Sequence, residues 1–324
     1  MTTAAEQAAG PDVTTMYRDM VRIRRFEETV QGLFMQSLVS GTTHLAQGQE
    51  AVAVGVAQAL RPDDYSTYTY RGHHHALARG LDLEAAFAEL LGRATGINHG
   101  KGGSMHLTDA RLGLYGSFAI VGAGLPVAVG LGRAAQLRKD GRISATFFGD
   151  GATNIGAFHE AMNLASVWKA PVLFVCENNL YGEYSSLRST TPVEDLAVRA
   201  SAYAMRAQIV DGNDVLAVYE SAREAAALAR AGEGPTFLEY KTYRHRGHSR
   251  SDPGKYRPDE EVNAWLARDP LIIARRRLID TGASDESELD RIEAEVGAEV
   301  EAAVERAKSA PWPELSEVTT DVYA

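Results

Sequence analysis

The sequence predicts an α/β protein with three layers, in which helices cover both faces of a mainly parallel sheet and further helices extend it at both ends of the chain. From residue 125 onward, short apolar segments alternate with helical ones, which is the βαβ signature of a parallel sheet. Near both termini, apolar residues recur at helical spacing. Polar turns follow two predicted strands, one with Gly-Asp-Gly and the other with Asn-Asn, at the edge where such sheets bind ligands.

The first predicted element is an amphipathic helix near the N-terminus. Its apolar side chains recur every three or four residues, at Met16, Met20, Ile23, Phe26, Val30 and Leu33. Residues 49–60 and 82–92 are also predicted to be helical. Residues 98–124 are rich in glycine, but apolar residues interrupt the glycines. This stretch is therefore predicted to be a loop within the fold.

The alternating pattern comes next. It predicts helices at residues 125–137, 154–168 and 215–231, and buried strands at residues 143–148, 171–176 and 236–242. A last helix carries Leu289, Ile292, Val296, Val300 and Val304, and Asp285 and Glu288 suit its first turn. The sequence shows no internal repeat and no interdomain linker. We therefore expect a disordered start at residues 1–13 and a single domain at residues 14–324.

Composition excludes several classes of protein. The formal charge of −10, from 33 basic and 43 acidic residues, disfavours a nucleic-acid partner, which a basic surface usually binds. The sequence has no run of about 18 apolar residues, so no transmembrane helix is expected. The first ten residues lack the pattern of a secretory signal. Cys176 is the only cysteine in the sequence, so no intrachain disulfide can form. A reducing cytoplasm fits this composition, with Cys176 as an inert thiol in the core.

The densest chemistry lies at Gly149-Asp150-Gly151-Ala152-Thr153-Asn154, between a predicted strand and a predicted helix. Two glycines let backbone N–H groups approach a phosphate closely, and the N-terminus of the next helix adds free N–H groups. An aspartate here would repel a bare phosphate. It fits if a divalent cation joins carboxylate and diphosphate, as Mg²⁺ does with oxygen ligands.

The second predicted strand ends at Glu177-Asn178-Asn179-Leu180-Tyr181-Gly182. Because neighbouring parallel strands end side by side, Asp150 and this asparagine pair should meet at one edge of the sheet. Gly-Asp-Gly alone also occurs in tight turns. Followed by a helix and a strand that ends in Asn-Asn, it favours a metal site over a turn capped by asparagine without a metal.

This pairing resembles the thiamine-diphosphate motif, and residues 14–315 resemble the α subunits of pyruvate, branched-chain 2-oxo acid and acetoin dehydrogenases. The resemblance implies the thiamine-diphosphate-binding fold. It also implies that Mg²⁺ is bound by Asp150, Asn179 and the backbone carbonyl of Tyr181. The residues that would line the diphosphate are Gly149, Gly151, Ala152 and Gly182.

Three further segments match this family: residues 43–50, 69–73 and 117–122. By resemblance, Tyr70 and Arg71 contact the diphosphate, and His44 faces the active-site channel. Arginine suits this role because its planar fork matches phosphate oxygens; without the resemblance, a lone arginine in a turn would be a solvated charge. Val121 would contact the cofactor. Many members carry glycine where this chain has Ala119, which we expect to be a weaker contact.

Histidines supply the remaining candidates. The triplet His73–His75 could suggest a transition-metal site, but no cysteine or spaced histidine completes a tetrahedral set. We carry His73 forward as a candidate for the catalytic channel. In the basic loop 243–256, the family has a histidine at the place of His248 that reaches the diphosphate, and imidazole can bind phosphate or move protons. Ser249 matches the position that is phosphorylated in mitochondrial relatives.

What the chain lacks is also informative. Thiamine enzymes use a carboxylate from a second domain to bind the aminopyrimidine ring, and only one α/β domain is found here. The resemblance implies that this domain is a separate β subunit in an α₂β₂ heterotetramer, and that the product passes to a lipoyl group on an acyltransferase. Pyruvate is the favoured substrate, with acetoin nearly level and branched-chain 2-oxo acids as a further alternative.

Two functions from other classes compete with this reading. The first is a scaffold that binds thiamine diphosphate or a partner without turnover. The second is a Mg²⁺-dependent phosphatase with Asp150 as its nucleophile, which the absence of a second aspartate near Asp150 disfavours. A β-subunit gene beside this one would support the enzyme over both.

Overall fold

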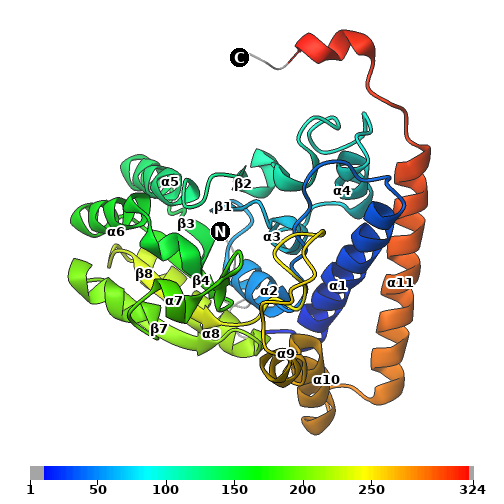
Figure 1. The fold of residues 1–324 in the computed structure, drawn as a ribbon. Helices are drawn as coiled ribbons and strands as arrows, with labels where there is room; N and C mark the ends of the chain where they lie inside the picture. Colours follow the sequence, from blue (N-terminus) through cyan, green and yellow to red (C-terminus); the bar gives the residue numbers. More distant parts are fainter. Residues whose placement is uncertain (1–10, 321–324) are drawn as a thin grey trace.

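The computed structural model describes residues 11–320, and its centre is a six-stranded parallel sheet in the order β2-β1-β3-β4-β8-β7. Figure 1 shows helices on both faces of this sheet. This confirms the predicted α/β class. The strands are β1 (Tyr65–Thr69), β2 (Leu114–Phe118), β3 (Ser144–Gly149), β4 (Val172–Asn178), β7 (Arg206–Asp211) and β8 (Thr236–Lys241).

Each face of the sheet has its own apolar core, because successive side chains of a strand point to opposite faces. Phe148, Phe174 and Phe237 pack in the core that α5 (Gly124–Arg138) and α6 (Gly156–Trp168) cover. Their neighbours Phe147, Val175 and Leu238 belong to the core on the other face, which is built with α8 (Val215–Arg230) and with α2 (Glu50–Ala59) packed against α8. Burial on both faces explains why the central strands read as continuous apolar runs.

Long helices from the two ends of the chain lie side by side, as the blue and orange ribbons of Figure 1 show. Helix α1 (Val13–Met35) begins after Asp12, whose carboxylate accepts hydrogen bonds from Thr14 N and Thr15 N. Helix α11 (Glu286–Ser309) begins after Asp285, which accepts one from Glu288 N. The predicted helical extensions are thus confirmed. Of the start expected at residues 1–13, residues 1–10 lie outside the described residues.

Several elements have no counterpart in the sequence prediction. They include β1, β2 and β7, helices α3 (His73–Ala78), α7 (Leu187–Thr190), α9 (Asp259–Leu266) and α10 (Pro270–Asp280), and the hairpin of β5 (Tyr181–Gly182) and β6 (Ser185–Ser186). The prediction of a loop over residues 98–124 is wrong for Leu114–Phe118, which forms β2. Its glycine and half-exposed side chains hide the alternation that marks a strand. Helix α4 (Leu83–Leu90) matches the predicted one.

A buried carboxylate organises the glycine-rich loop between α4 and β2. Glu89 Oε2 accepts hydrogen bonds from Asn98 N and Gly100 N at 2.7 and 2.9 Å, and Oε1 accepts them from Gly102 N and Gly103 N at 2.7 and 2.9 Å. These contacts pair four backbone N–H groups of a partly exposed loop and so fix its conformation. Within residues 11–320, no helix is long and apolar enough to cross a membrane.

Candidate active site

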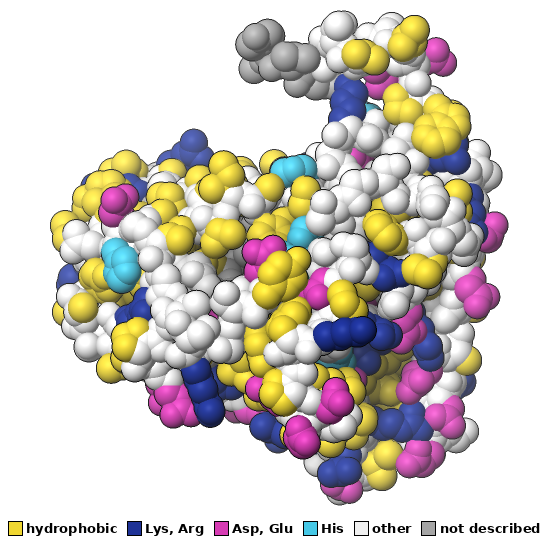
Figure 2. Space-filling model, viewed as in Figure 1, with side chains coloured by type: hydrophobic (Ala, Val, Ile, Leu, Met, Phe, Trp, Pro, Cys, Tyr) yellow, Lys and Arg dark blue, Asp and Glu magenta, His cyan; other side chains and the backbone are white. Residues whose placement is uncertain are grey.

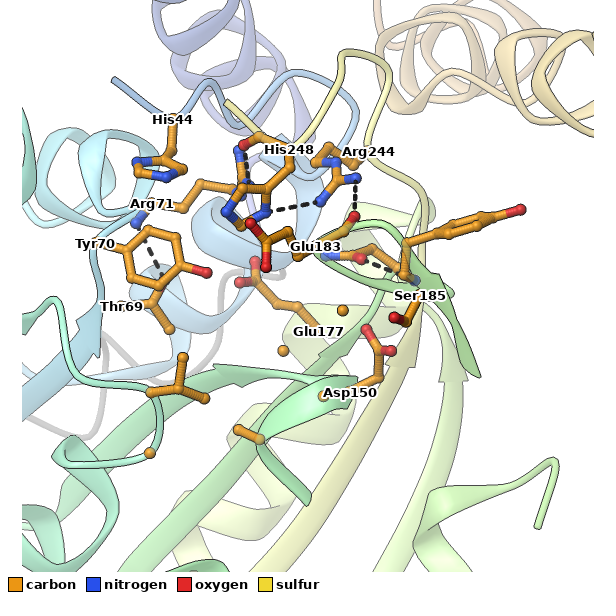
Figure 3. Close-up of a pocket in the computed structure, with 18 of the residues that line it drawn as sticks. His44, Thr69, Tyr70, Arg71, Asp150, Glu177, Glu183, Ser185, Arg244 and His248 are labelled. Atoms are coloured by element: carbon orange, nitrogen blue, oxygen red, sulfur yellow. Dashed lines mark hydrogen bonds between the residues drawn. The ribbon is translucent and has the colours of Figure 1, made fainter. Parts of the chain in front are cut away.

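A cavity of about 660 Å³ opens where strands β1, β3 and β4 end (Figure 3). Gly149 at the end of β3 pairs in register with Glu177 near the end of β4, so the expected meeting of the two strand ends is confirmed. The cavity is lined by the residues expected to bind the cofactor, which are Tyr70, Arg71, Ala119, Val121, Gly149, Asp150, Gly151, Ala152, Asn179, Tyr181, Gly182 and His248, and also by His44.

Asp150 lies on the cavity wall as a buried acid without a partner. Asp150 is 1% exposed, and neither of its carboxylate oxygens has a hydrogen-bond partner among residues 11–320. Burial raises the pKa of Asp150 to about 6, against the weaker opposing effect of nearby backbone N–H groups. A buried anion without a well-formed hydrogen bond is unfavourable unless a cation neutralises it. The site therefore fits a divalent cation held by Asp150.

The turn after β4 brings two more groups to this point. Asn179 Nδ2 donates to Gln49 Oε1 at 2.8 Å, and Tyr181 N lies 3.4 Å from Asn179 Oδ1. A Cβ atom at Gly151 would come within 3.3 Å of the Gly182 Cα atom. Side chains at these glycines would crowd the wall, so bare backbone forms it on both sides. Such a wall fits a diphosphate, which backbone N–H groups can approach.

Two guanidinium groups border the same cavity. Arg71 donates to the carbonyls of Leu45 and His248 at 2.6 and 2.7 Å, and burial, followed by the nearby Arg244, lowers its pKa to about 10. Arg244 Nη2 donates to Tyr256 Oη at 2.8 Å. The sequence signal for Arg244 was the basic run of the 243–256 loop, within which no single arginine stood out. Both cations suit an anionic ligand.

The His44 and His248 rings meet edge to face on the cavity wall, with centroids 5.0 Å apart, and the centroid of the Tyr70 ring lies 4.4 Å from that of His44 (Figure 3). Burial and the charge of Arg71 lower the pKa of His44 to about 3 and that of His248 to about 4. Both imidazoles are therefore neutral at pH 7. A neutral imidazole can donate one hydrogen bond and accept another, so this pair can bind a polar ligand.

His73 does not reach the cavity, which corrects its expected place in the catalytic channel. The ring is fully buried, with Nδ1 at 3.0 Å from Glu27 Oε2 and Nε2 at 2.8 Å from Ser104 Oγ. Helix α3 begins at His73 and points this side chain into the core of α1 and α4. Because both ring nitrogens are paired inside the protein, His73 joins the helices to the glycine-rich loop.

The next two histidines meet a residue that sequence reasoning did not select. His74 Nε2 lies 3.0 Å from Glu177 Oε1, and His75 Nε2 lies 3.3 Å from Glu177 Oε2. The side-chain atoms of His74, His75 and Glu177 lie close enough together to hold one metal ion. However, Nδ1 of each ring is buried without a partner among the described residues 11–320, whereas a metal-bound imidazole donates its other N–H to an acceptor. The rings fit better as donors to Glu177.

Charge supports this arrangement of Glu177. Burial raises the pKa of Glu177, but His75 and His74 outweigh that effect and hold it below its usual range. Burial and the neighbouring His74 lower the pKa of His75 to about 4. An ionised carboxylate is thus held by imidazole N–H groups in the wall of the cavity. Glu177 was not predictable as a partner, because more than 100 residues separate it from the histidines.

Comparison with known proteins identifies the family of this chain. Residues 18–316 match the family described as Dehydrogenase E1 component.

The chain belongs to this family as an α subunit.

The E1 α chain is 44% identical to the α subunit of acetoin:2,6-dichlorophenolindophenol oxidoreductase of Bacillus subtilis, over 95% of this chain and 92% of that protein. It is also 44% identical to the α subunit of the pyruvate dehydrogenase E1 component of Zymomonas mobilis, over 96% and 88%. The mitochondrial pyruvate dehydrogenase E1 α subunit of Dictyostelium discoideum is 43% identical, over 96% of this chain and 82% of that protein. The E1 α chain is therefore part of an oxidoreductase of the pyruvate/acetoin dehydrogenase type.

Proposed function

We propose that this E1 α chain binds thiamine diphosphate through Mg²⁺ in the 660 Å³ cavity and, together with a β subunit, decarboxylates pyruvate. The observation that carries the proposal is the buried carboxylate of Asp150, which lacks any partner in the described chain. It lies between a glycine-lined wall and the asparagine turn after β4. When bound, the cofactor supplies an electron sink for cleavage next to a carbonyl group.

The residues divide the work of holding this cofactor. Asp150, Asn179 Oδ1 and the Tyr181 carbonyl would ligate Mg²⁺, since hard oxygen atoms are its preferred ligands. The diphosphate would lie along Gly149, Gly151, Ala152 and Gly182, with Tyr70, Arg71 and His248 near its oxygens and Ala119 and Val121 beside the rest of the cofactor.

His44 and His248 are the proposed catalytic groups of this chain. Both line the cavity and both are neutral at pH 7, because burial lowers the pKa of each. In this state, each ring can donate one hydrogen bond and accept another. They would orient the substrate's carboxylate or carbonyl group and take up or release a proton there.

A β subunit would complete the site. Residues 11–320 form one six-stranded parallel sheet and one two-stranded hairpin, and they contain no second α/β unit to bind the aminopyrimidine ring. Val121 on the cavity wall is 46% exposed, and its chain neighbour Ile120 is 76% exposed. Figure 2 shows further hydrophobic side chains over α5 and α6, where Val127, Leu164, Val167 and Trp168 are exposed. An apolar surface of this kind suits a protein partner. The proposed assembly is α₂β₂, with a lipoyl-bearing acyltransferase as acceptor.

Acetoin is the second candidate substrate, since the Bacillus subtilis relative named for acetoin is as similar as the Zymomonas mobilis relative named for pyruvate. The test is dye reduction by this chain co-expressed with its β subunit, in the presence of thiamine diphosphate and Mg²⁺. Pyruvate, acetoin and 2-oxoisovalerate are offered in turn. We expect reduction that needs both chains and is fastest with pyruvate. If this chain and the β subunit form a complex that binds the cofactor but reduces no dye, the proposal is contradicted.

A further inference from the structure

Gln49 occupies the wall of the cavity directly behind Asn179, as the residue that precedes α2. Its side chain is fully buried. Oε1 accepts the hydrogen bond from Asn179 Nδ2 at 2.8 Å, whereas Nε2 is buried without a partner in the described part of the chain. One end of this amide thus touches an expected metal ligand, and the other end is an unused donor.

Donor and acceptor chemistry fixes the orientation of both amides. Tyr181 N can only donate, so the Asn179 atom that it approaches at 3.4 Å must be the oxygen. The other Asn179 atom is then the amide nitrogen, and Gln49 must present an oxygen to it. Consequently Gln49 Nε2 cannot turn toward Asn179 and is left with the cavity as its source of an acceptor.

The turn that carries Gln49 is held in place by charged groups. Glu27 Oε1 accepts from Ala46 N at 3.1 Å, and Glu50 Oε2 accepts from Gly48 N at 2.9 Å. Arg24 Nε in turn donates to Glu50 Oε1 at 2.6 Å. With its backbone fixed in this way, Gln49 can hold an orientation that a mobile turn could not maintain.

We propose that Gln49 is a positioning residue of the metal centre, which turns Asn179 Oδ1 toward the cation and donates a hydrogen bond from Nε2 to the diphosphate. The inference rests on the proposed binding of thiamine diphosphate and Mg²⁺. A buried donor without a partner is unfavourable, and an anionic oxygen that enters the cavity would satisfy it. Groups that orient metal ligands commonly change metal affinity about 10- to 100-fold when removed.

Two substitutions separate the two halves of the proposal. Gln49→Leu removes the acceptor for Asn179 and the donor to the diphosphate. Gln49→Glu keeps an oxygen for Asn179 but turns a carboxylate toward the diphosphate. Gln58→Leu is the matched control, because Gln58 lies on α2, the helix that Gln49 precedes, and its exposed side chain does not line the cavity.

The experiment uses the complex with the β subunit, freed of cofactor, and calorimetric titration. Mg²⁺ is titrated at saturating thiamine diphosphate, and thiamine diphosphate at saturating Mg²⁺. For Gln49→Leu we expect Mg²⁺ affinity to fall at least about 10-fold. For Gln49→Glu we expect Mg²⁺ affinity to be retained while thiamine diphosphate affinity falls at least about 10-fold, and for Gln58→Leu both should match wild type. Thermal unfolding without cofactor should change little in Gln49→Leu, since an unsatisfied donor is lost together with one hydrogen bond.

Any other result of these titrations would refute either the proposed function or the role of Gln49. If the wild-type complex binds neither ligand, the proposed function itself fails. If it binds both and Gln49→Leu binds them equally well, the role of Gln49 is refuted. If Gln49→Leu does not assemble, Gln49→Glu decides, because unchanged thiamine diphosphate affinity in that variant would refute the donor role. A loss of Mg²⁺ affinity in Gln49→Glu would refute the orientation of Asn179 by the glutamine oxygen.

Discussion

Replacing Asp150 by asparagine should stabilise the cofactor-free protein at neutral pH while it abolishes metal-dependent binding of the cofactor. Burial raises the pKa of Asp150 from 3.8 to about 6, so the folded state holds this proton more tightly than the unfolded state. Stability therefore falls as the pH rises from about 4 to about 6, and the loss persists above that range. The rise in pKa corresponds to about 3 kcal/mol, because one pKa unit equals about 1.4 kcal/mol.

The expected gain in the free energy of unfolding of Asp150→Asn is smaller than about 3 kcal/mol. The new Nδ2 group, if it finds no acceptor, costs about 1 kcal/mol, which leaves about 2 kcal/mol. With an unfolding entropy of roughly 2 cal/mol/K per residue, this corresponds to a Tm about 3 °C higher for a chain of 324 residues. Thermal unfolding of the cofactor-free protein at pH 7.5 and at about pH 4 measures it, and the difference should shrink at the lower pH.

Asp64→Asn is the matched control, since Asp64 is equally buried but fully paired. Its Oδ1 accepts from Ile143 N and Arg230 Nη1, each at 2.9 Å, and its Oδ2 accepts from Arg61 N at 2.7 Å. The same chemical change should therefore lower the Tm there. Addition of thiamine diphosphate and Mg²⁺ should raise the Tm of wild type but not that of Asp150→Asn. A Tm for Asp150→Asn below wild type at pH 7.5 would refute the claim that an uncompensated charge lies at this position.

Three further results are expected. His248→Ala should slow turnover of the complex with the β subunit about 100-fold without a change in Tm, and wild-type rates would remove His248 from the chemistry. Glu177→Gln should lower the free energy of unfolding by about 2 kcal/mol, because the imidazole of His74 or His75 then loses its acceptor. An unchanged Tm would show that these hydrogen bonds to Glu177 do not stabilise the fold. Glu89→Gln should speed amide hydrogen exchange in residues 98–103, whereas unaltered exchange would show that the loop does not depend on this carboxylate.

The sequence alone was sufficient for the central part of the fold and for the core of the site. Apolar spacing located α1 and α11, because a helix that packs on a core must repeat its apolar residues every three to four positions. The order of short apolar runs and helices identified β3, α6 and β4. Once these strands are parallel and adjacent, their ends must meet, so the approach of Asp150 and Asn179 follows from local pattern and topology.

Only the tertiary structure decided how polar side chains from separate loops pair on the cavity wall. Gln49 meets Asn179 across 130 residues of chain, and Arg71 meets the His248 carbonyl across 177. Such contacts leave no local period in the sequence, because they depend on how separate loops pack over the end of the sheet. The same packing turns His73 into the helical core and His74 and His75 toward Glu177. Whether a polar residue serves a ligand or a neighbouring backbone is therefore set by the segment that covers it, which only the folded chain specifies.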